Sequence, residues 1–366
     1  MKILKVLIGL IFLIVFCCGC VNENYNSGKK ESYSKKNLKH IKIIDRDKRT
    51  EVELPFENLS SFSSYKDDIY ISVGDKNPYG MANKLINFNK KTKKVTTLFT
   101  SKFSDPSVQG VQTNGKWLTW IDSDGYGTKI NIYLMNIETK KIEAVMHEND
   151  PSIQNSFPVL SDSHLAWIYY DRKKEKSYVM IRDLNKHRNT KIHSLNSHTL
   201  QNNDLSVQNK KILFTDVEKK GGICYIYDIP KQKLYHFRVP HKNIGWGELL
   251  NDHQFVYLSF NSSSFSDNKL VLYNTSTKKV KEFSNKKMGV DGLQKDSSNH
   301  LFVHMDGYED YQIYKVNENT ITKLGKLNES DIFDISTNQM GDYLMMKDKT
   351  DKRSSLLITT SDLPLN

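Results

Sequence analysis

One phrase recurs along most of this 366-residue chain and constrains its fold more than any other feature. In each copy an apolar strand ends near an Asn or Asp, a lysine-rich turn follows, and a second short strand returns, as in INIYLMNIETKKIEAV around Asn136. The other copies, at intervals of 41 to 49 residues, centre on Asn87, Asp183, Asp228, Asn274 and Lys315. A period of this length indicates a repeat architecture in which each repeat is one supersecondary unit.

A second hairpin lies in each interval, as in VQTNGKWLTWID and PVLSDSHLAWIYY, and seven copies of it can be counted. Asn, Asp and Gly occupy the middle of most copies, as tight hairpin turns require. Two hairpins per period make a four-stranded antiparallel unit, and a ring of such units leaves only short protected edges. The sequence therefore predicts an all-β fold, a β-propeller of seven four-stranded antiparallel blades. Six blades remain the alternative, if the terminal segments only decorate the rim.

Both ends of the chain carry strand patterns that can complete the last blade. IKIIDRDKRTEVEL around Asp45 precedes the repeats, and SLLITTSD near Thr359 follows them. We expect these segments to close the ring as two strands plus two, or as three plus one. The propeller domain is accordingly placed at residues 40–366.

The first residues of the chain have the pattern of an export signal. Lys2 and Lys5 form a short positive segment before an apolar run, Val6 to Phe16, which is too short to span ~30 Å of hydrocarbon as a permanent helix. The following Cys17-Cys18-Gly19-Cys20 resembles the lipobox of bacterial lipoproteins, although Cys17 stands where that pattern usually has Leu. The resemblance implies a signal peptide over 1–19, a diacylglyceryl thioether on Cys20 and palmitate-type acylation. An ordinary secretory signal cleaved near Gly19 is the alternative.

Residues 20–39 have no apolar period and are rich in Asn, Ser, Lys and Glu, a composition that cannot pack into a core. We interpret them as a lipidated N-terminus and flexible tether, which places the protein at the extracytoplasmic face of the cell membrane. The five lysines of the tether can each add ~1 kcal/mol of attraction to an anionic bilayer. A codon bias toward Lys and Asn is the alternative explanation. In the mature chain only Cys224 would remain a free thiol, and its strand pattern ICYIYD predicts a small buried side chain.

Trp120 and Trp167 lie in the phrases TWIDSDGYGTKINIYLMNIETKK and AWIYYDRKKEKSYVMIRDLNK. These phrases resemble the TolB-like β-propeller superfamily and, among lipid-anchored proteins, the uncharacterised YqgU-type lipoproteins of Gram-positive bacteria. The resemblance extends over nearly all of the mature chain and rests on degenerate motifs. It implies a propeller that is often six-bladed, and it supplies no catalytic residues.

The strands of a blade alternate in direction, so its connections sort between two faces of the ring. Lysines concentrate in the turns between third and fourth strands, which predicts one basic face: Lys90, Lys91, Lys93, Lys94, Lys140, Lys141, Lys186, Lys231, Lys233, Lys278 and Lys279. The opposite face collects carboxylates and aromatic side chains. The candidates for ligand binding there are Asp122, Asp124, Asp306 and Asp310, accompanied by Asp171, Asp216, Glu309, Tyr126, Tyr170 and Tyr308. A net charge of +11 suits attachment to teichoic acid, anionic lipid or another polyanion. Solvation of ordinary turns is the alternative.

Metal binding has two candidate sites in this sequence. His147, His193, His198 and His241 fall in successive links between blades, from which imidazoles could converge on Zn²⁺. Asp122-Ser123-Asp124-Gly125 resembles the start of a Ca²⁺ loop, but Tyr133 stands where the twelfth-position Glu is required, and a hairpin turn explains the segment. His164, His253 and His300 occupy equivalent tight turns and are expected to be structural. We predict no cofactor.

The function class follows from what the chain lacks. It has no G-x-S-x-G elbow, P-loop or H-E-x-x-H motif, which favours a non-catalytic binding or assembly module at the cell envelope over an enzyme. The alternatives are an envelope glycan hydrolase or lyase that uses acidic-face carboxylates, and a sensor of a solute or metal in the central channel. We expect a monomer held by membrane lipid through Cys20, with an unknown envelope protein or wall polymer as partner and no nucleic acid.

Overall fold

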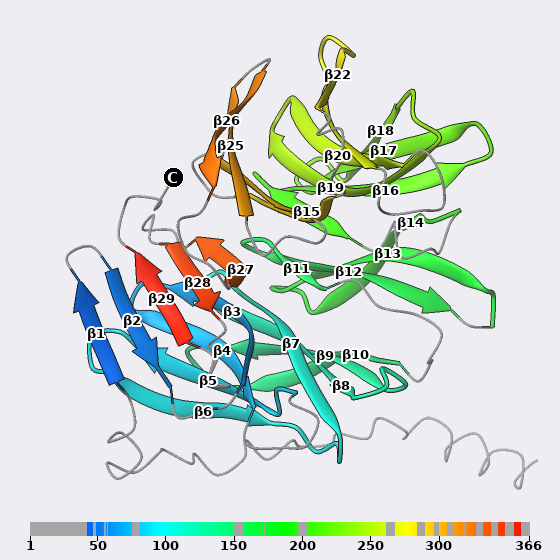
Figure 1. Ribbon diagram of the computed structural model, residues 1–366. Helices are drawn as coiled ribbons and strands as arrows, with labels where there is room; N and C mark the ends of the chain where they lie inside the picture. Colours follow the sequence, from blue (N-terminus) through cyan, green and yellow to red (C-terminus); the bar gives the residue numbers. More distant parts are fainter. Residues whose placement is uncertain are drawn as a thin grey trace, which may run out of the picture.

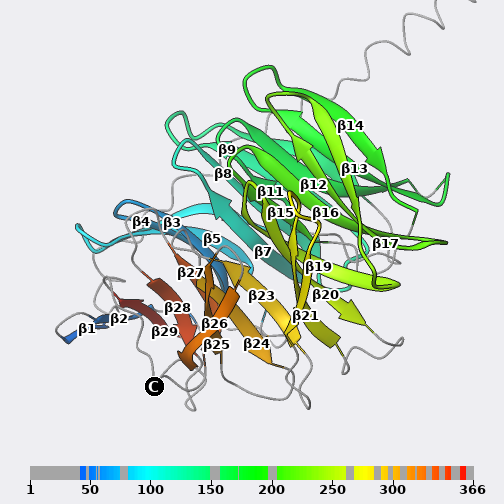
Figure 2. The same cartoon turned by 90° about the horizontal axis from the view of Figure 1, so that it is seen from above.

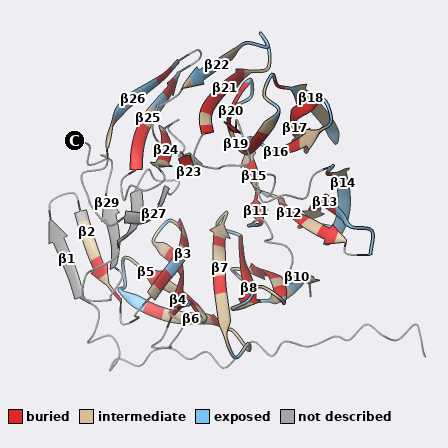
Figure 3. Ribbon diagram, turned by 45° about the vertical axis from the view of Figure 1, so that its right-hand side comes forward, coloured by how far each residue is buried: buried red, intermediate tan, exposed pale blue. Residues whose placement is uncertain are grey.

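The computed structural model describes residues 42–46, 49–54, 56, 58–74, 81–148, 157–171, 173–196, 204–260, 268–283, 290–295, 300–305, 311–317, 320–326, 332–337, 343–347 and 355–359. These residues form 29 strands in seven antiparallel sheets, which stand around a common centre as the blades of a propeller (Figures 1 and 3). No helix in the described ranges is long and apolar enough to cross a membrane. The signal-peptide and tether predictions, including Cys20, lie outside the described residues.

Six of the sheets are four-stranded blades whose strands follow chain order. Blade 1 is β3 (Asn58–Tyr65), β4 (Asp68–Gly74), β5 (Lys84–Asn89) and β6 (Lys94–Thr100). Blade 2 is β7 (Pro106–Thr113), β8 (Trp117–Asp124), β9 (Ile130–Asn136) and β10 (Ile142–Glu148). Blade 3 is β11 (Val159–Leu160), β12 (His164–Asp171), β13 (Lys176–Asp183) and β14 (Arg188–Ser194).

The remaining four-stranded blades repeat this order. Blade 4 is β15 (Leu205–Gln208), β16 (Lys211–Glu218), β17 (Gly221–Asp228) and β18 (Lys233–Arg238). Blade 5 is β19 (Asn243–Asn251), β20 (Gln254–Phe260), β21 (Asn268–Asn274) and β22 (Val280–Phe283). Blade 6 is β23 (Val290–Lys295), β24 (His300–Met305), β25 (Tyr311–Asn317) and β26 (Thr320–Lys326).

The seventh blade closes the ring with strands from both ends of the chain. Its order is β27 (Ile332–Thr337), β28 (Tyr343–Lys347), β29 (Ser355–Thr359), β2 (Arg49–Glu53) and β1 (Lys42–Arg46). The blue and red strands lie side by side in Figures 1 and 2, and β29 pairs with β2 from Arg49 opposite Thr359 to Glu53 opposite Ser355. The prediction of seven blades is confirmed. The prediction of two plus two or three plus one strands is wrong, because both strands of the N-terminal hairpin join three C-terminal strands.

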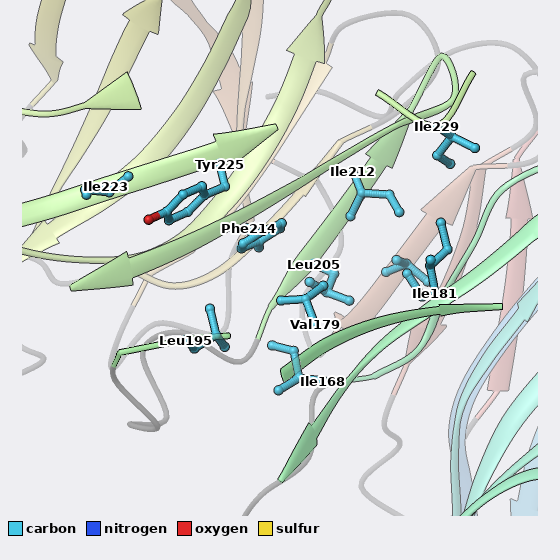
Figure 4. Packing of buried hydrophobic residues seen from close by; sticks show 12 residues of the cluster. Ile168, Val179, Ile181, Leu195, Leu205, Ile212, Phe214, Ile223, Tyr225 and Ile229 are labelled. Atoms are coloured by element: carbon cyan, nitrogen blue, oxygen red, sulfur yellow. The ribbon is translucent and has the colours of Figure 1, made fainter. Parts of the chain in front are cut away.

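The hydrophobic core of this protein lies between the blades. Each of six buried clusters joins two neighbouring blades, and the cluster between blades 3 and 4 packs Ile168 and Val179 against Phe214 and Tyr225 (Figure 4). The first strands of consecutive blades are in contact from β3 to β23, and β27 contacts β3. Blades therefore stabilise one another face to face, because a single sheet cannot bury both of its apolar faces alone.

The tryptophans that suggested the family resemblance serve this core. Trp120 and Trp167 occupy the same position of the second strand in blades 2 and 3, and both are buried. Trp120 packs at ring-centroid distances of 5.1 Å from Phe99 in blade 1 and 5.5 Å from Tyr133. Cys224 is fully buried in the cluster between blades 4 and 5, which confirms the prediction of a small buried side chain.

Strand direction divides the connections between two faces of the ring. We call the side with the first-to-second and third-to-fourth turns the turn face, and the side with the second-to-third turns and the interblade links the link face. Because β2 runs antiparallel to β29 and β1 antiparallel to β2, the chain enters the propeller at Lys42 on the link face. The last described strand, β29, ends at Thr359 on the turn face.

Candidate functional site

The repeated Asn or Asp caps the turn between the third and fourth strands in blades 1 to 5. Asn136 Oδ1 accepts hydrogen bonds from the backbone N–H groups of Glu138 at 3.1 Å and Thr139 at 2.9 Å. The side-chain oxygens of Asn89, Asp183, Asp228 and Asn274 accept equivalent bonds from backbone N–H groups of their turns. Such Asx turns satisfy backbone donors that the sheet leaves unpaired. The recurring anchor is therefore structural.

Two of the predicted anchors are displaced by two residues. In blade 1 the capping residue is Asn89, whereas Asn87 donates from Nδ2 to Asp68 Oδ1 at 3.0 Å. In blade 6 the third strand ends at Asn317, opposite Thr320, rather than at Lys315. The alternation of apolar and polar residues did not show where each strand ends, because Asn and Lys also occupy polar positions inside these strands.

Several lysines of the turn face adopt the left-handed backbone conformation, which lysine rarely adopts. Ten residues other than Gly have positive φ in the described chain, and five of these are lysines: Lys66, Lys93, Lys140, Lys210 and Lys278. All five lie in turns of the turn face. Gly and Asn adopt this left-handed region more readily than Lys does. The turns thus carry a lysine where conformation alone would favour Gly or Asn.

The turns between third and fourth strands differ in the residue that anchors them. Where the anchor is an Asp, the turn lysine pairs with it, as in Lys231 with Asp228 at 3.0 Å and Lys186 with Asp183 at 3.7 Å. Where the anchor is an Asn, the anchor itself carries no charge, and Lys93, Lys140 and Lys278 follow it. Lysines are therefore present in these described turns, as the sequence indicates.

Two pockets hollow the turn face on either side of the turn at Asn209 and Lys210. One, of about 530 Å³, lies between blades 4 and 5 and is lined by Asn209, Asn251, Asp252, His253, Gln254, Asn274, Ser276 and Thr277. The other, of about 490 Å³, lies between blades 3 and 4 and is lined by Leu160, Ser161, Asp162, Val207, Gln208, Asn209 and Lys210. Most of the residues that line the two pockets carry amide, hydroxyl or charged groups, although both pockets also expose carbon atoms.

A polar cluster joins the first strands of blades 4, 5 and 6, the strands nearest the centre of the ring. We call it the axial cluster: Asp204, Ser206, Gln208, Glu248 and Lys295. Ser206 Oγ donates to Glu248 Oε2 at 2.5 Å and accepts from Leu249 N at 3.0 Å. Lys295 Nζ donates to Gln208 Oε1 and to the carbonyl oxygens of Leu249 at 3.2 Å and Leu250 at 3.0 Å.

The two carboxyl groups of the axial cluster are held in surroundings that disfavour charge. Loss of bulk water raises the pKa of Glu248 to about 7. The hydrogen bond from Ser206 and the charge of Lys295 act to lower this pKa, whereas the charge of Asp204 acts to raise it. Burial alone raises the pKa of Asp204 to about 6. Sequence reasoning missed this cluster because its members come from three repeats. Its one local signal is a set of polar residues in the short inner strands LSVQ, GELL and LQK.

The structure separates the predicted acidic candidates. Asp122 is buried at 2% exposure, and burial outweighs a hydrogen bond from Ser101 to raise its pKa to about 6. The carboxylate of Asp124 caps its own turn, accepting from Thr128 N at 2.6 Å, from the Thr128 hydroxyl and from Lys129 N at 3.2 Å. These two carboxylates therefore do not form an open Ca²⁺ loop. Asp306 and Asp310 lie outside the described residues.

The two histidine candidates with described side chains lie at different blade interfaces. The ring centroids of His193 and Tyr225 lie 4.3 Å apart between blades 3 and 4. His241 bonds Tyr257 Oη at 2.7 Å and Glu282 Oε1 at 2.9 Å between blades 4 and 5. Within the described ranges no three His, Cys, Asp or Glu side chains are grouped to hold a metal ion. The His147 side chain and the whole of His198 lie outside the described residues.

The link face is mixed in charge rather than acidic over blades 2 to 4. Asp171 is paired with Lys174 at 2.7 Å, which lowers the pKa of that carboxyl group. Asp216 is fully buried and accepts from Asn196 N at 2.8 Å, which ties the preceding link to β16. Lysines also occur in these turns and links: Lys102, Lys129, Lys173, Lys174, Lys219, Lys220 and Lys242. The expected division into basic and acidic faces is thus incomplete.

No family model matches this chain, and no curated protein matches it in sequence. Among solved structures, an oligogalacturonate lyase in complex with manganese matches with TM-score 0.57 and 10% identity over 88% of this chain and 96% of that one. The β-propeller domain of the Trilobed protease from Pyrococcus furiosus has TM-score 0.56 and 12% identity, over 84% and 94%. The WD40 domain of Toxoplasma gondii coronin has TM-score 0.55 and 10% identity, over 88% and 86%.

A further match, TolB from Acinetobacter baumannii, has TM-score 0.41 and 12% identity over 76% of this chain and 60% of that one. This likeness is too distant to support the resemblance to the TolB-like superfamily. Identities of 10 to 12% carry the fold and not the activity. The chain is, on its own sheet topology and on these likenesses, a β-propeller.

Proposed function

We propose that this chain is an exported, lipid-anchored and non-catalytic binding module whose turn face holds an anionic polymer of the cell envelope. The observation that carries the proposal is the placement of Lys66, Lys93, Lys140, Lys210 and Lys278 at left-handed positions of one face. A codon bias explains many lysines, but it favours Asn codons equally, and Asn suits these positions better. The choice of Lys there is therefore best explained by its charge.

Attachment to the envelope is supported by the sequence alone, through the export signal and the cysteine at position 20. A polyanion would reach the turn face as an extended chain, because the lysines are spread around the ring and not gathered in one pocket. Such attraction is electrostatic and must weaken with salt, since the Debye length falls from ~10 Å at 0.1 M to ~3 Å at 1 M. The two polar pockets of the same face can take uncharged hydroxyl-bearing units between the charges.

The experiment is binding of purified mature protein to isolated wall polymer at low and high salt. We expect retention at low salt, release at high salt and at least a tenfold loss of affinity when Lys90, Lys91, Lys140, Lys141, Lys278 and Lys279 are replaced by Gln. A matched control replaces six link-face lysines by Gln: Lys102, Lys129, Lys173, Lys219, Lys220 and Lys242. Equal loss in both variants would point to net charge alone, and no loss in the first would sink the proposal.

A second candidate function is suggested by the axial cluster. Two carboxyl groups with raised pKa values beside Lys295 offer hydrogen-bond donors and acceptors to a small polar solute near the centre of the ring. The propeller fold is shared by enzymes and binding domains, so it does not decide between solute binding and glycan cleavage. Calorimetry with wall-derived sugars on the wild type and on Glu248→Gln tests this candidate. A product of cleavage would favour the hydrolase or lyase alternative.

A further inference from the structure

Exposed apolar side chains of the described residues gather on the link face. Four large hydrophobic residues of the described chain are exposed: Met81 at 39%, Tyr126 at 82%, Phe157 at 46% and Leu324 at 39%. The first three lie in the second-to-third turns and links of blades 1 to 3, on the link face. Leu324 lies within β26, the outermost strand of blade 6. Three of the four exposed apolar side chains therefore lie on one face of the ring, in or next to neighbouring blades.

The turn that presents Tyr126 is held rigidly. Asp124 caps it through Thr128 and Lys129, and Gly127 N donates to Asp124 O at 2.9 Å. Gly125 N donates to Asp105 O, and a side chain at Gly125 would collide with the Asp105 carboxylate. Gly127 has φ +66°, which a residue with a side chain rarely adopts. The backbone that carries the most exposed aromatic side chain of the described residues is thus restrained, so little backbone entropy is lost when Tyr126 makes a contact.

Phe157 is positioned by blade 2. Its ring packs on Gly110, where a Cβ would lie 2.5 Å from Phe157 Cδ1, and Gly110 has φ +65° in a bulge of β7. Gly110 therefore makes room for a ring that is still half exposed on the link face.

The tether enters the propeller on this same face. β1 begins at Lys42 on the link face of blade 7, and blade 7 is the neighbour of blade 1 in the ring. Residues 20–39 hold the proposed anchor at Cys20 and five lysines. Lys129 ends the exposed turn of blade 2, Lys102 lies in the link that enters blade 2, and Lys173 and Lys174 lie in the corresponding turn of blade 3. Aromatic rings beside lysines match the interfacial layer of an anionic bilayer.

We propose that the link face of blades 1 to 3 rests on the membrane, with Tyr126, Phe157 and Met81 in the interfacial layer of an anionic bilayer. This inference rests on the proposed anchor at Cys20, and it orients the molecule. The turn face then points away from the bilayer, so its lysines meet wall polymer and not lipid headgroups.

The test uses the full lipidated protein in vesicles of phosphatidylcholine and phosphatidylglycerol that carry nitroxide-labelled lipid. Cys20 would be alkylated and Cys224 is buried, so an introduced cysteine is the accessible thiol for a fluorophore. Glu175→Cys and Glu138→Cys are matched positions, since both are exposed Glu residues in turns, the first on the link face and the second on the turn face. We expect at least threefold stronger quenching of the label at position 175. Equal quenching, or stronger quenching at position 138, overturns the orientation.

A second measurement assigns the contact to the named side chains. Tyr126→Ser in the Glu175→Cys protein should reduce quenching by at least half, because a serine does not reach the interfacial layer. Tyr126 is exposed, so this variant keeps the fold, whereas Phe157→Ser disturbs the contact with Gly110. Leu324→Ser is the matched control and should leave quenching unchanged. An unchanged Tyr126→Ser signal overturns the contact, and failure of the wild type to float with vesicles overturns the anchor. Wall-polymer binding by the turn face is measured separately and can fail on its own.

Discussion

Ser206 donates its hydroxyl hydrogen to Glu248 at 2.5 Å and so joins the inner strands of blades 4 and 5 next to the carboxyl group of Asp204. The bond holds Glu248 in place but does not offset the loss of bulk water around it, and the pKa of Glu248 is raised from 4.5 to about 7. A stabilising contact and a destabilising ionisation therefore act on the same side chain.

This raised pKa predicts how stability depends on pH. The folded state binds the Glu248 proton more tightly than the unfolded state, so its contribution is complete below about pH 4.5 and is lost as the pH rises through 7. Glu248→Gln mimics the protonated form and should raise the free energy of unfolding at pH 8 by at most about 3 kcal/mol. Urea denaturation at pH 5 and pH 8 checks this, with the gain of the variant confined to the higher pH.

The control for that prediction is Glu282→Gln. Hydrogen bonds from Lys269 and His241 hold the pKa of Glu282 below its usual value, so its stabilisation is present above the unfolded pKa and is lost in acid. The Gln variant should be slightly less stable than the wild type at pH 8, the opposite direction. A gain in both variants would trace the effect to net charge rather than to the axial cluster.

The closing blade predicts that the ring fails when β29 is lost. Deleting residues 357–366 removes Leu357, Ile358 and Thr359, which pair with β28 on one side and β2 on the other. We expect a lower melting temperature for the whole domain and aggregation through the exposed strand edges. Deleting only 362–366 leaves β29 intact and should melt with the wild type. A normal melt for the longer deletion would show that the blade closes without β29.

The Asx turns predict a local cost for losing the cap. Asn136→Ala removes the acceptor for the N–H groups of Glu138 and Thr139, and the loss of one capping side chain typically costs ~1 to 2 kcal/mol. Asn185→Ala is the control, because that exposed turn residue is not the anchor of its turn. Chemical denaturation of both variants should separate them by more than the measurement error. Similar stability for the two would mean that the backbone holds the turn unaided.

The blade repeat could be predicted because its signal is local. Strand alternation, turn residues and the Asn or Asp anchors all lie within about 45 neighbouring residues, and they indicated seven blades and the burial of Cys224. The composition of the closing blade and the axial cluster could not be predicted in this way. Glu248, Ser206 and Lys295 meet only through the relative register of three inner strands, which no single repeat specifies. Asp124 was misleading for a related reason. Its carboxylate accepts hydrogen bonds within its own turn, whereas the sequence suggested that it could bind a ligand.

Lipidation at Cys20 is predicted to be the step that holds the protein at the membrane. Cys20→Ala should abolish metabolic labelling with a radioactive fatty acid and release the protein from the membrane fraction, while the propeller stays folded because every described strand lies between residues 42 and 359. Far-UV circular dichroism of the released variant is the control for folding. Equal labelling of variant and wild type would assign the anchor elsewhere, and an ordinary signal cleavage near Gly19 would then be the better interpretation.

The left-handed lysines allow stability and binding to be separated in one variant. Lys93, Lys140 and Lys278 have φ between 57° and 59°, where Gly is free of the strain that a side chain causes. If these lysines served the fold, replacing all three by Gly would lower stability.

We expect the reverse, no loss or a gain of roughly 0.5 to 1 kcal/mol per site, since Gly relieves the strain but adds freedom to the unfolded chain. Binding to wall polymer at low salt should fall at the same time, because three cations leave the turn face. The same three sites changed to Arg keep the charge and should keep the binding. A Gly variant that loses stability and retains its affinity for the polymer would return these lysines to a structural role, and the pockets beside Asn209 would become the better candidates for recognition.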